Sequence, residues 1–99
     1  MSSSTLNPDS GARVLLELSR ETDAHVEYRV SIHVPSDSFV GAAHIDVGTG
    51  AIAFAAWDQH REPPAWTVDQ ARAFLRTLHK NRADDGWPRR VLRWRQQRA

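Results

Sequence analysis

Hydrophobic and polar residues alternate without a break along residues 25–34, HVEYRVSIHV. Alternation with a period of two predicts a β-strand that buries one face and exposes the other. A shorter stretch, residues 13–19, alternates in the same way, with Val14, Leu16 and Leu18 on one side. The pattern therefore predicts two neighbouring strands, each of which needs a core on one face.

Turn-forming residues divide the next part of the chain into further strands. A three-residue loop at 21–23, a four-residue loop at 35–38 and a two-residue turn at Gly48-Thr49 each bring apolar side chains opposite apolar side chains. Gly48 suits this turn because a type II′ turn needs a positive φ at its first central residue. We therefore predict a four-stranded antiparallel meander, with a register that pairs Leu16 with Tyr28, Tyr28 with Ile45, and Ala43 with Phe54.

One helix is predicted to cover the apolar face of this sheet. Thr67 and Gln70 have the spacing of a capping box, in which the threonine side chain accepts a hydrogen bond from a free amide at the helix start. Apolar residues then recur every three or four positions, as in an amphipathic helix. We expect a helix from about residue 68 to residue 81, with a buried stripe formed by Val68, Ala71, Phe74, Leu75 and Leu78.

The C-terminal segment, residues 84–99, fits two structures. Pro88 is favoured in the first turn of a helix, where its missing N–H is not needed, and the residues after it are good helix formers. Leu92 and Trp94, however, alternate with arginines as in an edge strand. The composition slightly favours a short helix, and both alternatives stay open.

The predicted fold class is therefore α+β: a four-stranded antiparallel β-meander with one helix, residues 68–81, packed on one face, and a short C-terminal helix or edge strand. Residues 1–10 are polar and contain nothing to bury, so we expect a disordered N-terminal tail. Residues 11–99 are long enough for a single α+β domain with one core.

Composition excludes several classes of protein. Hydrophobic residues make up 40% and charged residues 25% of the 99 positions, which is typical of an ordinary soluble domain. The chain has no cysteine, which excludes disulfides, thiol nucleophiles and cysteine-ligated zinc. The longest apolar run, residues 51–57, is too short to span a membrane, and the serine-rich start lacks the features of a signal peptide. We expect a cytoplasmic protein with no membrane contact.

Charge is unevenly distributed along the chain. Residues 1–58 carry three arginines against eight acidic residues, a net charge of −5, whereas residues 59–99 carry nine arginines and one lysine against four acidic residues, a net charge of +6. Such a split is typical of proteins that bind anionic partners. A GC-rich bacterial genome would also favour arginine over lysine, so the split alone does not indicate a function.

Four ionisable side chains form the first candidate site. On the polar face of the predicted sheet, Arg29 falls opposite His44, and Glu27 falls opposite Asp46. Such a cluster is able to bind an anion or a metal, or to shift the pKa of a histidine. A solvated sheet face with weak ion pairs, each contributing about 0–1 kcal/mol, is the more common outcome. We therefore expect no metal and no cofactor.

The second candidate is the loop between the last meander strand and the helix, where Trp57, His60, Arg61 and Trp66 follow one another closely. Aromatic and arginine side chains on a loop are typical of protein-recognition surfaces because they provide contact area at low entropic cost. The alternative is that both indoles fold back and seal the end of the sheet. No nucleophile motif accompanies the histidine, so the sequence does not favour an enzyme.

The third candidate is the arginine-rich C-terminal segment. Arginine pairs with phosphate through two hydrogen bonds, and indole rings stack on bases, so this segment has the means to bind single-stranded nucleic acid. The alternative is a solvated arginine face that docks its tryptophans on the domain. The residues concerned are Arg89, Arg90, Arg93, Trp94 and Arg95.

Small apolar residues form a flat surface on the other face of the third and fourth predicted strands, and an uncovered surface of roughly a few hundred Å² is typical of an interface. We therefore interpret the chain as a small non-enzymatic binding or adaptor domain of bacterial type. It would contact a protein partner, or a second copy of itself, through this surface and the loop tryptophans. Nucleic-acid binding through the C-terminal segment is the alternative. The surface comprises Val40, Ala42, Ala51, Ala53, Ala55 and Trp57.

Overall fold

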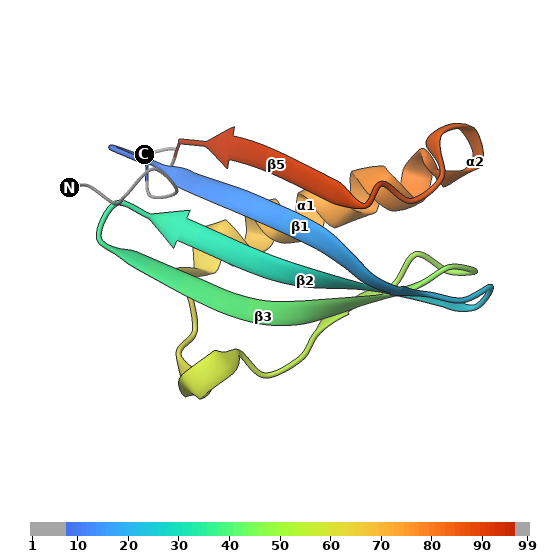
Figure 1. Cartoon of the computed structure of the whole chain (residues 1–99), viewed down its shortest axis with the longest axis horizontal. Helices are drawn as coiled ribbons and strands as arrows, with labels where there is room; N and C mark the ends of the chain where they lie inside the picture. Colours follow the sequence, from blue (N-terminus) through green and yellow to red (C-terminus); the bar gives the residue numbers. More distant parts are fainter. Residues whose placement is uncertain (1–7, 97–99) are drawn as a thin grey trace.

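The computed structural model describes residues 8–96 and shows an α+β fold built on one antiparallel sheet (Figure 1). The predicted class is confirmed, but the sheet has five strands rather than four, in the order β4-β3-β2-β1-β5. None of the helices in residues 8–96 is long and apolar enough to cross a membrane. The strands are β1 (Ala12–Glu21), β2 (His25–Val34), β3 (Asp37–Asp46), β4 (Ile52–Phe54) and β5 (Arg90–Arg95), and the helices are the short 3-10 helix η1 (Asp58–His60), α1 (Ala65–Lys80) and α2 (Arg82–Asp85).

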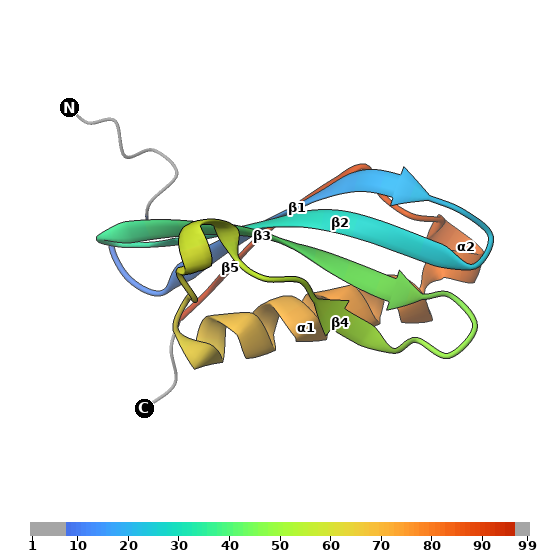
Figure 2. The same ribbon diagram turned by 90° about the horizontal axis from the view of Figure 1, so that it is seen from below.

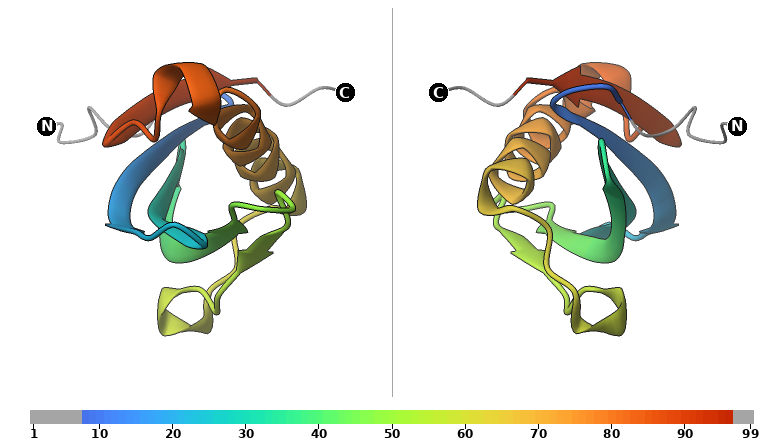
Figure 3. Two further views of the ribbon diagram at one scale, coloured as in Figure 1. Left: turned by 90° about the vertical axis from the view of Figure 1, so that its right-hand side faces the viewer. Right: turned by 90° about the vertical axis from the view of Figure 1, so that its left-hand side faces the viewer.

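The sheet curves around α1. Figure 2 shows α1 running along one face of the sheet, and Figure 3 shows the sheet turning from β5 through β1, β2 and β3 to β4. The helix lies on the concave side, between the two edge strands. The core fills this space, with fully buried side chains from the three central strands and from the helix. They include Val14, Leu16, Tyr28, Val30, Ile32, Ile45 and Leu75.

The C-terminal segment contains an edge strand, β5, where composition had slightly favoured a helix. β5 pairs antiparallel with β1, so that Val91 lies opposite Leu16 and is buried. Leu92 and Trp94 point to the other face of the sheet. Alternation therefore outweighs helix propensity here, because a strand buries Val91 and also pairs the backbone groups along the edge of β1.

The register between the first three strands differs from the prediction by two residues. Leu16 lies opposite Val30 rather than Tyr28, and Tyr28 lies opposite Ala43 rather than Ile45. A shift of two residues keeps each side chain on its predicted face, because the side-chain period of a strand is two. The apolar pattern therefore fits both registers equally well.

A shorter turn accounts for the shift between β2 and β3. Pro35 and Ser36 alone form the turn, and Asp37 and Ser38 already belong to β3. Both polar side chains have partners within the strand pair: the Asp37 carboxylate accepts a hydrogen bond from the Ser38 amide, and Ser38 Oγ lies 2.8 Å from His33 Nδ1. Residues typical of a loop are therefore accommodated in a strand because they have local partners.

The pairing of β3 with β4 is the predicted one, but the turn between them is not a two-residue turn. The positive φ, 79°, is at Gly50 and not at Gly48. Asp46 organises the longer loop: its carboxylate accepts a hydrogen bond from the Thr49 amide, and its carbonyl accepts one from the Gly50 amide. An aspartate that bonds the backbone a few residues ahead is a common way to shape such a loop.

Helix α1 begins three residues earlier than predicted, because Pro64 and not Thr67 occupies its N-cap position. Thr67 lies within the first turn, is fully buried, and donates its hydroxyl hydrogen to the Pro64 carbonyl at 2.6 Å. The capping-box prediction is therefore wrong, and a proline with a φ suited to helix entry starts the helix. The predicted buried stripe is confirmed at Ala71 and Leu75.

The predicted N-terminal tail lies mostly outside the described residues, which begin at Pro8. Pro8 is buried, and the carbonyl of Ser10 accepts a hydrogen bond from the indole of Trp94 at 2.9 Å. The part of the tail that the structure describes is therefore in contact with β5.

Gly41 on β3 allows Trp57 to pack against the sheet. A Cβ atom at position 41 would lie 2.6 Å from Cε3 of the indole, which is closer than carbon atoms approach in proteins. Trp57 is 8% exposed and stacks on Phe54, with ring centroids 5.8 Å apart. A side chain at position 41 would therefore push away the indole that closes this end of the core.

We predict that Gly41→Ala lowers the free energy of unfolding by about 1–3 kcal/mol, the usual effect of overpacking. Urea denaturation followed by tryptophan fluorescence measures this change. Gly48→Ala is the matched control, because a Cβ atom there would meet only Asp46 Oδ1 at 3.4 Å, an ordinary contact. Equal stabilities for the two variants would contradict the packing argument.

Candidate functional site

The sheet face opposite α1, which we call the outer face, carries alternate residues of every strand. Paired residues form rows across β5, β1, β2 and β3. The rows contain apolar, basic and other polar side chains, so the outer face is neither a uniform charged surface nor a uniform apolar one. The rows are Trp94–Arg13–His33–Ser38, Leu92–Leu15–Ser31–Val40 and Arg90–Glu17–Arg29–Ala42.

Two large apolar side chains of the outer face are exposed to solvent. Leu92 is 39% exposed and Trp94 is 44% exposed, and both are on β5. The indole of Trp94 keeps its orientation through its hydrogen bond to the Ser10 carbonyl. A leucine and an oriented tryptophan that are exposed on one strand are typical of a contact surface.

β5 is the last strand of the sheet, so no other strand in residues 8–96 pairs with its far edge. The carbonyl of Arg89 accepts a hydrogen bond from the Leu18 amide at 2.9 Å and therefore points toward β1. Backbone groups of successive residues in a strand point to opposite sides. The N–H and C=O groups of Arg90, Leu92 and Trp94 consequently point toward the open edge.

The arginines of β5 lie on both of its faces. Arg90 is on the outer face, whereas Arg93 and Arg95 are on the face toward α1. The guanidinium groups of Arg93 and Arg95 donate to the carbonyls of Leu92 and Trp94, each at 3.0 Å. These two arginines therefore cover part of the open edge. The residues of β5 that were predicted to bind nucleic acid lie on both faces of the strand, so they do not form one surface.

A groove of about 330 Å³ separates β5 from α1 and α2. Its apolar lining includes Leu78 on α1 and Val91 on β5, and its charged lining includes Arg93 on β5 and Asp85 on α2. Beyond the groove, Arg95 lies over the ring of Phe74 on α1, 5.2 Å from its centroid. Sequence reasoning missed this groove because it forms between segments that only the fold brings together.

Tyr28 holds the start of β5 in place. Its hydroxyl, on β2, donates to the Pro88 carbonyl at 2.6 Å, and its ring centroid lies 6.4 Å from that of Trp87. Burial and, to a lesser extent, the Glu21 carboxylate raise the pKa of Tyr28 to about 12. The hydroxyl therefore stays protonated and able to donate over the physiological pH range.

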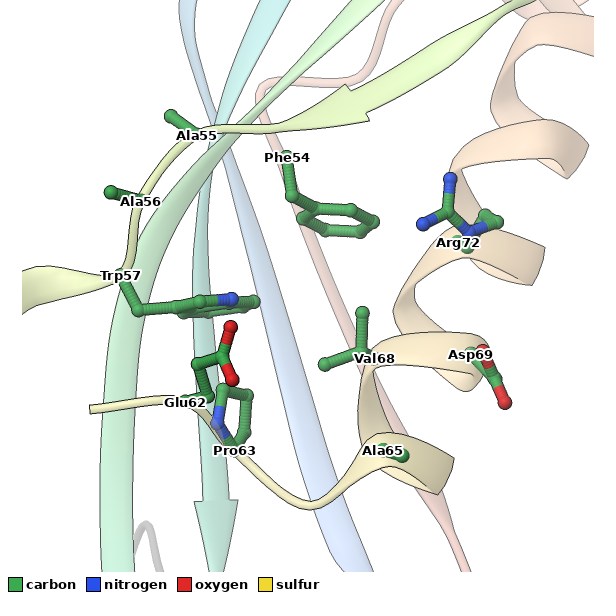
Figure 4. A pocket seen from close by; sticks show the side chains of 10 residues that line it. All are labelled: Phe54, Ala55, Ala56, Trp57, Glu62, Pro63, Ala65, Val68, Asp69 and Arg72. Carbon is green, nitrogen blue, oxygen red and sulfur yellow. The ribbon is translucent and has the colours of Figure 1, made fainter. Parts of the chain in front are cut away.

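A second pocket, of about 680 Å³, lies between β4 and the start of α1 (Figure 4). Figure 4 shows the rings of Phe54 and Trp57 stacked on one side, and Arg72 pointing toward Phe54 from the helix. The guanidinium lies 5.0 Å from the Phe54 centroid and donates to a backbone carbonyl of β4 at 3.1 Å. Glu62 and Asp69 also line the pocket. Its arginine therefore already has partners within the fold.

The predicted loop surface is only partly exposed. Trp57 is buried, and Trp66 is half-buried in the first turn of α1, where it packs against the core. His60 and Arg61 are exposed, and Arg61 forms an ion pair with Asp37. The hydrogen bond from Arg61 and that from the following amide hold the pKa of Asp37 below its usual value. The two indoles therefore contribute more to the core than to an accessible surface.

The predicted polar cluster is rearranged by the register. Glu27 and not Arg29 lies opposite His44, with Oε1 and Nδ1 3.6 Å apart, and His25 lies opposite Asp46. A pocket of about 300 Å³ adjoins Glu27, His25 and His44. In residues 8–96, no group of three or more histidine, aspartate or glutamate side chains is positioned to hold a metal ion.

Comparison with known proteins gives no family for this chain. A scan against models of protein families found no matching family, and searches of curated proteins and of solved structures found no significant match. The side chains and backbone of this chain are therefore the basis for inferring its function.

His33 is a buried titratable group of the outer face. It is 8% exposed, and burial together with the charge of Arg13 lowers its pKa below the usual value. The unfolded chain therefore takes up a proton at a higher pH than the folded protein does, and stability must fall as the pH drops through the usual histidine range.

We predict that the free energy of unfolding decreases as the pH is lowered from about 7 to about 5, and that His33→Gln flattens this slope. Urea denaturation at a series of pH values measures the effect. An unchanged slope in the variant would show that His33 is not the group responsible.

We also predict that Tyr28→Phe lowers the free energy of unfolding by about 1–3 kcal/mol, because it leaves the Pro88 carbonyl without its donor. The loss should be concentrated in β5, where amide hydrogen exchange should accelerate more than in β2. A variant with equal changes in exchange over both strands would contradict the anchoring role of this hydrogen bond.

Proposed function

We propose that this chain is a small non-enzymatic binding domain whose partner is a protein, contacted through β5 and the adjoining part of the outer face. The observation that carries the proposal is the exposure of Leu92 and Trp94 on a strand with an open edge. Apolar side chains and backbone groups that no other strand pairs together suit a protein partner, which is able to satisfy both. A cytoplasmic location in a bacterial cell is part of this proposal.

The contact surface proposed here differs from the one that the sequence favoured. Trp57 and Trp66 pack against the core, whereas Leu92 and Trp94 extend from β5 into solvent. Val40 lies in the same row of the outer face as Leu92, so the small apolar residues of β3 can extend the contact. Large exposed side chains near the centre of a contact usually contribute most of its binding energy.

Nucleic-acid binding is the second candidate function. Arg90 and Trp94 share the outer face with Arg29, and an exposed indole beside arginines is able to stack on a base. Glu17 lies between Arg90 and Arg29 in the same row and would repel phosphate. For this reason we place a protein partner first.

Photo-crosslinking tests the proposed function. A photoreactive phenylalanine at position 92 should form discrete protein adducts in cells, whereas the same residue at position 73, exposed on α1, should not. Adducts that nuclease removes would establish nucleic acid as the partner instead. Identical adducts from both positions would show random collision and contradict a contact at β5.

A further inference from the structure

We propose that β5 receives an extended acidic segment of the partner as a sixth strand, laid antiparallel along its open edge beside α1. The inference rests on the proposed protein-binding function and specifies the chemistry of the partner. Three features of the structure support it: the direction of the backbone groups, the placement of the arginines and the groove beside the strand.

The backbone of β5 is arranged to pair with another strand. The N–H and C=O groups of Arg90, Leu92 and Trp94 face the open edge, at every second residue as strand pairing requires. The carbonyls of Leu92 and Trp94 now accept hydrogen bonds from arginine side chains. Amides of an added strand would replace these donors and release the two guanidinium groups.

The released arginines select acidic side chains. Residues opposite one another in an antiparallel pair share a face of the sheet, so the residues opposite Arg93 and Arg95 would lie on the side of α1. The residue opposite Arg90 would lie on the outer face. Acidic side chains at these three positions would each have an arginine neighbour, which makes an acidic segment electrostatically complementary to β5.

The remaining positions favour apolar side chains. The residue opposite Val91 would face the groove of about 330 Å³, which Leu78 also lines. The residues opposite Leu92 and Trp94 would cover these two exposed side chains. The preferred segment, from its N-terminus, is therefore acidic, apolar, acidic, apolar, apolar and acidic, opposite residues 95 to 90.

A second copy of β5 is a poor occupant of this edge. Antiparallel pairing of two β5 strands about Leu92 would place Arg95 of one copy opposite Arg89 of the other and would bring the two Arg93 side chains into diagonal positions on the same face. Like charges that face one another across a strand pair are destabilising. The arginines therefore disfavour self-association at this edge and favour a partner of opposite charge.

Nucleic acid fits the edge less well. A phosphate backbone does not have the alternating N–H and C=O groups that would pair with the outward backbone groups of β5. Arg90 is on one side of the strand, whereas Arg93 and Arg95 are on the other, so they do not form one platform beside the Trp94 indole. An added strand, by contrast, has side chains on both sides.

The test uses the synthetic peptide Glu-Val-Glu-Val-Val-Glu and ¹⁵N-labelled full-length protein at about 0.15 M salt. Binding should shift the amide signals of Arg90, Leu92 and Trp94 and slow their hydrogen exchange. The same peptide with lysine in place of glutamate should bind at least about tenfold more weakly, because each of its charges would face an arginine.

N-methylation of the peptide separates strand pairing from simple charge attraction. Methyl groups on the second and fourth amides, opposite Trp94 and Leu92, would remove hydrogen bonds to β5 and should weaken binding at least about tenfold. Methyl groups on the third and fifth amides point away from β5 and should change binding less than about threefold. Equal weakening by the two modifications would overturn the proposal.

A matched pair of protein variants tests the role of arginine. Arg93→Glu should weaken peptide binding at least about tenfold, whereas Arg76→Glu, on an exposed position of α1, should leave it unchanged. Equal effects would contradict recognition at β5. Tighter binding of a single-stranded oligonucleotide than of the peptide, with a steep decrease at higher salt, would favour nucleic acid instead.

The two proposals fail in different ways. If no peptide binds while position 92 still crosslinks to a discrete protein, the partner is a protein but strand addition is wrong. If the crosslinks at position 92 are to nucleic acid, the proposed function itself is wrong, whatever the peptide does.

Discussion

The width of one helix governs this fold. An α-helix with its side chains is about 10–12 Å across, whereas five strands about 4.8 Å apart make a much wider flat sheet. α1 is the one long helix in the described residues, so a flat sheet would leave part of its apolar face uncovered. Curvature resolves this mismatch: the sheet turns around α1, and the helix fills the space between the two edge strands (Figure 3). Each edge then has a junction with the helix, and a pocket lies at each junction.

The two junctions are chemically different. At β4, stacked aromatic rings and Arg72 line a pocket, and the arginine has a ring and a backbone carbonyl as partners. At β5, Val91 is the buried side chain of the strand, and the other five residues are exposed. The backbone of β5 also faces outward over about 20 Å of strand, because six residues rise about 3.3 Å each. The first junction therefore stabilises the fold, and the second presents groups that a partner can use. Tyr28 connects the two roles, because a core residue of the central strand fixes where β5 begins.

The alternation of apolar and polar residues predicted which face of each strand is buried, but it predicted neither the register between strands nor the lengths of the turns. It assigned the buried sides of β1, β2 and β3 correctly, since burial follows the strand period directly. It did not fix the register, because a two-residue shift leaves the same faces buried, and the polar partners of Asp37 and Ser38 decided the length of the turn. The groove beside β5 was harder to predict than the strand register. Arg93 faces a groove whose other wall comes from Leu78, and no local pattern relates these two residues.

Much of the positive charge in the second half of the chain lies in and next to β5. Four of the nine arginines in residues 59–99 lie between positions 89 and 95, in and next to β5, whose far edge pairs with no strand in residues 8–96. An open edge is an aggregation hazard, and positive charge reduces it because two copies repel one another. The same charge would not repel an acidic strand, so the arginines that disfavour self-pairing would also favour the acidic partner that we propose. In this proposal, the positive charge of β5 both prevents self-pairing and favours the acidic partner. In the proposed complex, an incoming strand would displace the hydrogen bonds from Arg93 and Arg95 to the edge carbonyls, and acidic side chains would offer these arginines new charged partners.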